Sequence, residues 1–68
     1  MGFHEDFAKI IKEAREKRGL TQVEVAKKAK IHFNYYAQIE RGKVKARGYI
    51  LNDIAHALGI KIKLPLGE

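Results

Sequence analysis

Cysteine and serine are absent from this sequence of 68 residues, and threonine occurs once, at Thr21. The lack of cysteine excludes disulfides, thiolate metal sites and cysteine nucleophiles. The lack of serine leaves Thr21 as the one candidate for a hydroxyl nucleophile. The three histidines, His4, His32 and His56, are far apart without the spacing of metal ligands, and no glycine-rich phosphate loop occurs. We therefore expect no enzyme, no metal site and no cofactor.

Long apolar runs are also missing, since no stretch approaches the roughly 20 residues that span a bilayer. The first residues carry Glu5 and Asp6 instead of a basic region followed by an apolar run, so we expect no leader peptide. These features predict a cytoplasmic protein. The length predicts one domain over residues 1–68. Such a domain buries only about 60% of its unfolded surface, so it depends on good helix packing or on a partner chain.

Positive charge is abundant and concentrated. The sequence has 14 Lys+Arg against 8 Asp+Glu, a formal net charge of +6. Between residues 27 and 47 one acidic residue, Glu40, is set against seven basic ones: Lys27, Lys28, Lys30, Arg41, Lys43, Lys45 and Arg47. This stretch indicates a polyanionic partner, either nucleic acid or an anionic membrane surface. The alternative is a solvated basic face without a partner.

Hydrophobic periodicity predicts four helices, over residues 3–18, 22–29, 33–40 and 48–58. The first has an apolar stripe of Phe3, Phe7, Ile10, Ile11 and Ala14. The second helix is expected to bury Val25, Ala26 and Ala29. The third is expected to bury Tyr36 and Ile39, and Phe33 could face either inward or outward. The fourth is expected to bury Ile50, Leu51, Ile54, Ala55 and Leu58. Thr21 and Glu24 have the spacing of a capping box. The segment 43–47 is expected to be a basic loop without an apolar pattern.

Near the end of the sequence, the hydrophobic pattern changes from a helical period to an alternation of apolar and polar residues. Ile60, Ile62 and Leu64 alternate with lysines, which predicts a short strand over residues 60–64. A single strand has no partner within the chain, so it either packs as an extended tail or pairs with the same strand of a second chain. We favour the second arrangement, which makes the protein a homodimer.

Residues 20–42 carry a family resemblance. They read LTQVEVAKKAKIHFNYYAQIERG, and DIAHALG follows at residues 53–59. A short helix with a Thr-Gln start, a small buried Ala26, a tight turn and a second helix ending in Ile-Glu-Arg-Gly have the form of a helix-turn-helix. The sequence resembles the Cro/C1-type (Xre-like) helix-turn-helix family over about residues 7–60. The resemblance implies an all-α, four-helix, lambda-repressor-like domain whose helix-turn-helix covers about residues 21–41.

The resemblance also implies which residues touch DNA. The segment His32–Glu40 corresponds to the recognition helix, which enters the major groove. Gln38 and Asn34 are the first candidates for reading bases, because their amides can form paired hydrogen bonds with adenine. His32 and Phe33 are further candidates, with Phe33 either on a thymine methyl group or folded onto the core. Expected contacts to the DNA backbone come from Gln22, Tyr35, Arg41, Lys43, Lys45 and Arg47.

Other consequences of the resemblance concern structure. Arg15 and Glu40 correspond to positions where some members form a buried ion pair, so we expect the two within salt-bridge distance. Lys30 stands at a turn position where glycine is common, and costs about 1 kcal/mol if its φ is positive. Ala46 and Arg47 replace a frequent Pro-Ser, so the fourth helix should lack a good cap. A strand in place of a fifth helix is similar to that of some antitoxins.

The leading hypothesis is a sequence-specific regulator of transcription that binds double-stranded DNA, a repressor acting as a homodimer on a palindromic operator. One alternative is an antitoxin that represses its own operon and binds a toxin. Another is a coactivator-like module that bridges proteins, with incidental DNA binding. A role on an anionic membrane is disfavoured, because no predicted helix combines a basic face with exposed aromatic residues.

Overall fold

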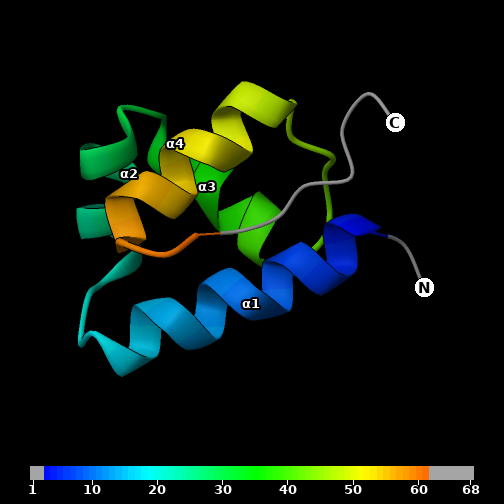
Figure 1. Cartoon of the computed structure of the whole chain (residues 1–68). Helices are drawn as coiled ribbons and strands as arrows, with labels where there is room; N and C mark the ends of the chain where they lie inside the picture. Colours follow the sequence, from blue (N-terminus) through cyan, green and yellow to red (C-terminus); the bar gives the residue numbers. More distant parts are fainter. Residues whose placement is uncertain (1–2, 62–68) are drawn as a thin grey trace.

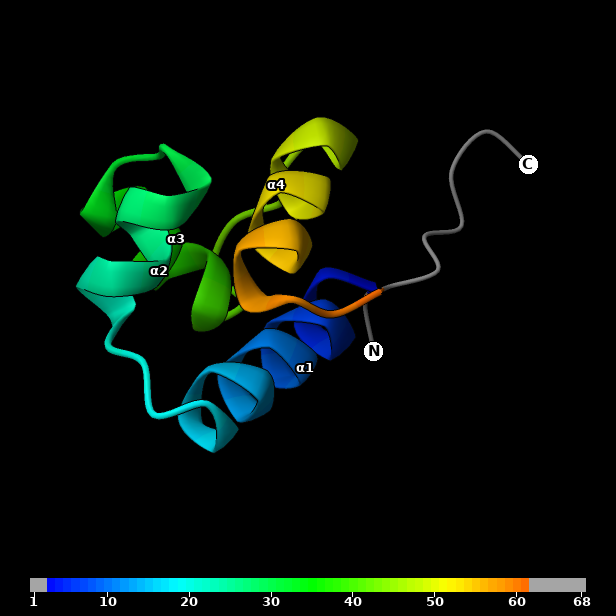
Figure 2. The same ribbon diagram turned by 60° about the vertical axis from the view of Figure 1, so that its left-hand side comes forward.

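The computed structural model describes the chain from residue 3 to residue 61, with side chains from Glu5 onward. It contains four helices, α1 (Phe3–Lys17), α2 (Gln22–Ala29), α3 (Phe33–Glu40) and α4 (Gly48–Leu58). Helix α1 lies along one side and packs against α3 and α4, while α2 packs against α3 and α4 (Figure 1). The view turned by 60° separates α2 and α3 from α4 (Figure 2). The predicted all-α, four-helix architecture is confirmed.

Local sequence explains where α2 begins. The Thr21 hydroxyl accepts a hydrogen bond from the Glu24 amide at 3.0 Å, and the Glu24 carboxylate accepts one from the Thr21 amide at 2.8 Å. This capping box satisfies two of the backbone donors that a helix start leaves unpaired. Helix α4 begins at Gly48, and its N-cap residue Arg47 makes no side-chain cap hydrogen bond, as the missing Pro-Ser predicts.

The turn between α2 and α3 is left-handed at Lys30, the position where glycine is common in the family. Lys30 adopts φ 60° and ψ 42°, and its amide bonds to the carbonyls at the end of α2. A side chain in this conformation costs roughly 1 kcal/mol relative to glycine. The sharp turn brings α3 directly against α2, which is the geometry of a helix-turn-helix.

The core lies between the four helices. Its fully buried large side chains are Tyr36, Phe7, Ile11, Ile39, Ile54, Leu58 and Val25. The prediction for Ile10 is wrong, since it is 46% exposed and Ala8 is buried in its place. Because each helical residue turns about 100°, an arc centred on Ile11 takes in Ala8 and leaves Ile10 outside. The predicted inward position of Phe3 lies outside the described side chains.

Two further predictions need correction. Val44 and Ala46 are partly buried and pack on the core, so the loop after α3 does have an apolar pattern. Apolar and basic residues alternate in this loop, but the alternation covers too few residues to be recognised in the sequence. Ile60 and Lys61 are not in a strand; the Ile60 amide instead bonds to the Ala55 carbonyl at 3.0 Å and closes the end of α4. The remainder of the predicted strand, with Ile62 and Leu64, lies outside the described residues. Within the described part, no helix is long and apolar enough to cross a membrane.

Candidate nucleic-acid interface

One side of α3 is buried and the other faces outward. Tyr36 and Ile39 anchor the helix in the core. The outward face presents four side chains that the family resemblance assigns to base reading: His32, Phe33, Asn34 and Gln38. None of them is a lysine, arginine, aspartate or glutamate. The face therefore offers amide and aromatic groups, which are suited to base edges and thymine methyl groups.

Two of these residues are placed by local structure. The His32 Nδ1 atom accepts a hydrogen bond from the Asn34 amide at 3.1 Å and so caps the start of α3. This role was missed in the sequence, because histidine is not among the usual N-cap residues. With Nδ1 engaged as the acceptor, Nε2 is the ring's donor. Phe33 is 41% exposed, so the structure places it on the outer surface and not in the core.

A basic strap, residues 41–47, follows α3. Its four cationic side chains, Arg41, Lys43, Lys45 and Arg47, are all exposed, while the residues between them are half-buried. Gly42 allows the chain to leave α3 sharply, with φ 72°, and the Lys43 amide bonds to the Gln38 carbonyl at 2.9 Å. The alternation therefore points every charge of the strap away from the core, beside the end of α3.

Tyr35 and the lysines near the α2–α3 turn are placed differently from the cations of the strap. Tyr35 is half-buried and packs against the core, so only part of its side chain is accessible to a phosphate. Lys27, Lys28 and Lys30 are exposed, but they belong to the last turn of α2 and the following turn. The basic stretch seen in the sequence is thus split between the strap and a second group near the α2–α3 turn.

A buried carboxylate joins three helices behind this face. We call the group the Glu40 cluster; its members are Arg15, Gln22, Tyr36 and Glu40. Arg15 donates to Glu40 from Nε at 2.8 Å and from Nη2 at 3.0 Å, so the ion pair implied by the resemblance is present. Gln22 Nε2 donates at 2.8 Å and the Tyr36 hydroxyl at 2.7 Å. Each carboxylate oxygen therefore accepts two hydrogen bonds.

The electrostatics follow from these contacts. Burial raises the pKa of the Glu40 carboxyl, but hydrogen bonds from Arg15, Tyr36 and Gln22 and the charge of Arg15 outweigh it, so the net pKa is lowered. The bond to Glu40 raises the pKa of Arg15. Burial, followed by the bond to Glu40, raises the pKa of the Tyr36 hydroxyl. Glu40 is thus ionised and Tyr36 protonated at neutral pH, and the cluster is a structural joint between α1, α2 and α3.

The cluster also orients Gln22, the first residue of α2. An amide nitrogen has two hydrogens, and the bond to Glu40 uses one of them. The other remains suited to a phosphate oxygen near the start of α2, where a helix favours anions. The sequence suggested Gln22 as a backbone contact but carried no sign of its bond to Glu40, because the two residues meet only in the folded chain.

Comparisons with known proteins agree with this geometry. A family model described as helix-turn-helix matches residues 11–64. The immunity repressor protein of Bacillus phage phi105 is 41% identical over 58 residues, which is 85% of this chain and 40% of that protein. The chain therefore spans less than half the length of this relative. Since the family model covers most of the chain, the protein belongs to the Cro/C1-type helix-turn-helix family.

Proposed function

We propose that the protein is a transcriptional regulator that binds double-stranded DNA at specific sequences. The observation that carries this proposal is the outward face of α3, which presents no Lys, Arg, Asp or Glu, next to the exposed cations of the strap. In such an arrangement, phosphate contacts supply affinity and position, and contacts to base edges supply specificity. A relative that is named an immunity repressor adds support, and we propose repression as the mode of action.

The proposed binding mode places α3 in the major groove. Gln38 and Asn34 contact base edges there, and Phe33 and His32 lie over neighbouring bases. The strap and Gln22 contact phosphates on either side of the helix. We further propose a homodimer whose two recognition helices are about 34 Å apart and read a palindromic site.

We propose binding without catalysis. The described residues contain no group of three or more possible metal ligands. The hydroxyl of Thr21 is engaged at the start of α2, where it serves as a cap. The titratable groups of the Glu40 cluster, Arg15, Tyr36 and Glu40, bond to one another.

Selection of bound duplexes from a random pool at about 150 mM salt, near physiological ionic strength, tests the proposal. A palindromic consensus with two half-sites about one helical turn apart is the expected result. Binding without enrichment would contradict sequence-specific regulation and favour a protein that bridges other proteins. A consensus consisting of one half-site would retain the DNA proposal and overturn the homodimer.

A further inference from the structure

A cleft lies along the outward side of α4. It consists of a hollow of about 490 Å³ between α4 and the α2–α3 turn, and a second of about 360 Å³ toward the end of α4. Asn52 and His56 line both hollows, so we treat them as one surface, the α4 cleft. None of its lining residues is among those assigned to DNA.

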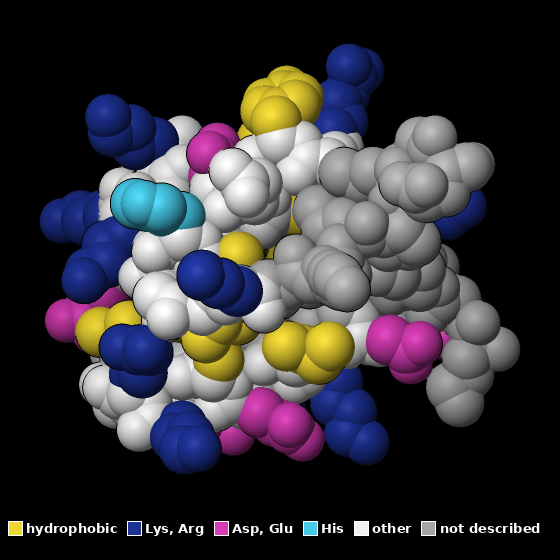
Figure 3. Space-filling model, viewed as in Figure 1, with side chains coloured by type: hydrophobic (Ala, Val, Ile, Leu, Met, Phe, Trp, Pro, Cys, Tyr) yellow, Lys and Arg dark blue, Asp and Glu magenta, His cyan; other side chains and the backbone are white. Residues whose placement is uncertain are grey.

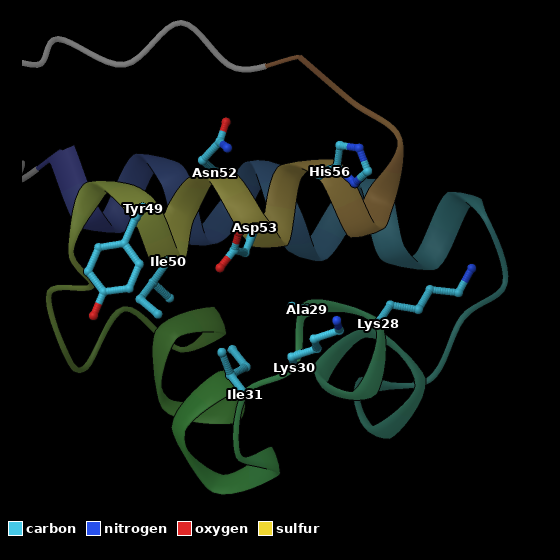
Figure 4. A pocket seen from close by; sticks show the side chains of 9 residues that line it. All are labelled: Lys28, Ala29, Lys30, Ile31, Tyr49, Ile50, Asn52, Asp53 and His56. Atoms are coloured by element: carbon cyan, nitrogen blue, oxygen red, sulfur yellow. The ribbon is translucent and has the colours of Figure 1, made fainter.

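The cleft has an apolar base and a polar rim. Ile31 and Ile50 lie at the base, where α4 approaches the α2–α3 turn, while Tyr49 and Asp53 project from α4 (Figure 4). Tyr49 is 64% exposed. An exposed aromatic ring beside aliphatic side chains is typical of the anchor positions of protein interfaces, whereas single scattered apolar residues have no such meaning.

The charge of the cleft is predominantly positive. Its lining includes three lysines, Lys28, Lys30 and Lys61, and a single acidic residue, Asp53. Lys and Arg side chains gather along the edge of this face on the α2 side, next to a histidine (Figure 3). Lys28, Lys30 and Lys61, which are not among the residues assigned to DNA, thus lie along the α4 cleft.

We propose that the α4 cleft binds an acidic, amphipathic segment of a partner protein. Carboxylates of the segment would pair with the lysines of the rim, and its aliphatic side chains would cover Ile31, Ile50 and Tyr49. A volume of this size is within the usual range for binding pockets. The proposal goes beyond DNA recognition and does not depend on it, because the two surfaces have no residue in common.

Other occupants fit the cleft less well. A DNA backbone would find no partner for the aliphatic base and would meet the carboxylate of Asp53. A second copy of this chain would have to bring an acidic surface, but the exposed side of α1 alternates Asp6, Glu13 and Glu16 with lysines. Electrostatic complementarity guides association and excludes like-charged partners, so an acidic segment is the better match.

Titration of the full-length, isotope-labelled protein with two designed peptides tests the inference by NMR. Both peptides are capped, have about 14 residues, or four helical turns, and carry leucines along one face. The remaining positions are glutamate in one peptide and lysine in the other. At about 150 mM salt, we expect the glutamate peptide to shift the amides of Ile31, Tyr49 and His56, and the lysine peptide to bind more weakly.

Charge and apolar variants sharpen the test. Lys28→Gln/Lys30→Gln should weaken binding of the glutamate peptide by about fivefold, as two exposed ion pairs are lost, and Tyr49→Ala should weaken it independently. Lys12→Gln/Lys17→Gln on α1 is the matched control and should leave it unchanged. Thermal unfolding of each variant shows that it is folded. Equal binding of both peptides, shifts centred on Gln38 and the strap, or no saturable shifts would overturn the proposal.

Discussion

Replacement of Glu40 by glutamine tests the buried cluster most sharply. The side chain of Glu40 is 3% exposed and that of Arg15 is 15% exposed, so the substitution leaves a largely buried guanidinium without its counter-ion. Whichever oxygen becomes the amide nitrogen, one Arg15 N–H loses its acceptor, because each oxygen receives an Arg15 bond. Removing one partner of a buried pair costs about 3–5 kcal/mol. Since Arg15 keeps some solvent contact, we expect the free energy of unfolding to fall by about 3 kcal/mol, the lower end of this range.

That loss is large for a chain of this size. At 0.05–0.15 kcal/mol per residue, 68 residues give a free energy of unfolding of roughly 3–10 kcal/mol. Urea unfolding followed by circular dichroism at 25 °C measures the change, with the slope m unchanged if the native and unfolded states keep their compactness. With m unchanged, we expect the urea midpoint of Glu40→Gln to fall by about 30% or more.

Glu16→Gln is the matched control. Glu16 also faces Arg15, at 4.0 Å, but its side chain is 58% exposed. A surface pair of this kind contributes about 0–1 kcal/mol, so the free energy of unfolding of the control should lie within about 1 kcal/mol of the wild-type value. If Glu40→Gln were no more destabilising than Glu16→Gln, the reasoning about desolvation and the four hydrogen bonds would be refuted.

The remaining predictions use the same logic on other contacts. Folding lowers the pKa of Glu40. Its contribution to stability is therefore present above its unfolded pKa of about 4.3 and is lost as the pH falls through the lower folded value. The urea midpoint of the wild type should fall in acid, and that of Glu40→Gln should fall by less. Lys30→Gly should raise the free energy of unfolding by roughly 0.5–1 kcal/mol by relieving the positive φ, whereas Lys28→Gly in α2 should lower it by about 1 kcal/mol. Lys43→Gln should reduce the slope of log affinity for DNA against log salt by about 0.9, with Lys12→Gln as a control that leaves the slope unchanged. Equal slopes in these two variants would remove Lys43 from the phosphate contacts.

Much of the fold could be predicted from the sequence because local signals agree with the tertiary contacts. Apolar period and capping residues located all four helices, and Thr21 with Glu24 marked the start of α2. Ile10 and Ala8 show the limit of this reasoning. Both lie near the edge of the apolar stripe, and the neighbouring helices decide which of the two is covered.

The candidate site was predictable in outline only. The resemblance indicated the outward residues of α3 and the ion pair of Arg15 with Glu40. It could not indicate that Gln22 donates to the same carboxylate, because Gln22 lies on a different helix. The capping role of His32 and the α4 cleft likewise arise from geometry that neither spacing nor composition encodes. The bond from Tyr36 joins residues four apart on α3, a spacing that brings side chains together on a helix, so this contact could have been predicted and was missed.

The most direct test of the central claim compares wild type and Gln38→Ala in parallel selections from a random DNA pool. Gln38 is exposed on α3 and makes no side-chain hydrogen bond among those that define the Glu40 cluster, so its removal should leave the fold intact. We predict loss of preference at one base pair in each half-site, a cost of about 1–3 kcal/mol on the best site, and unchanged affinity for unrelated DNA. An identical consensus from both proteins would contradict base reading by this face of α3.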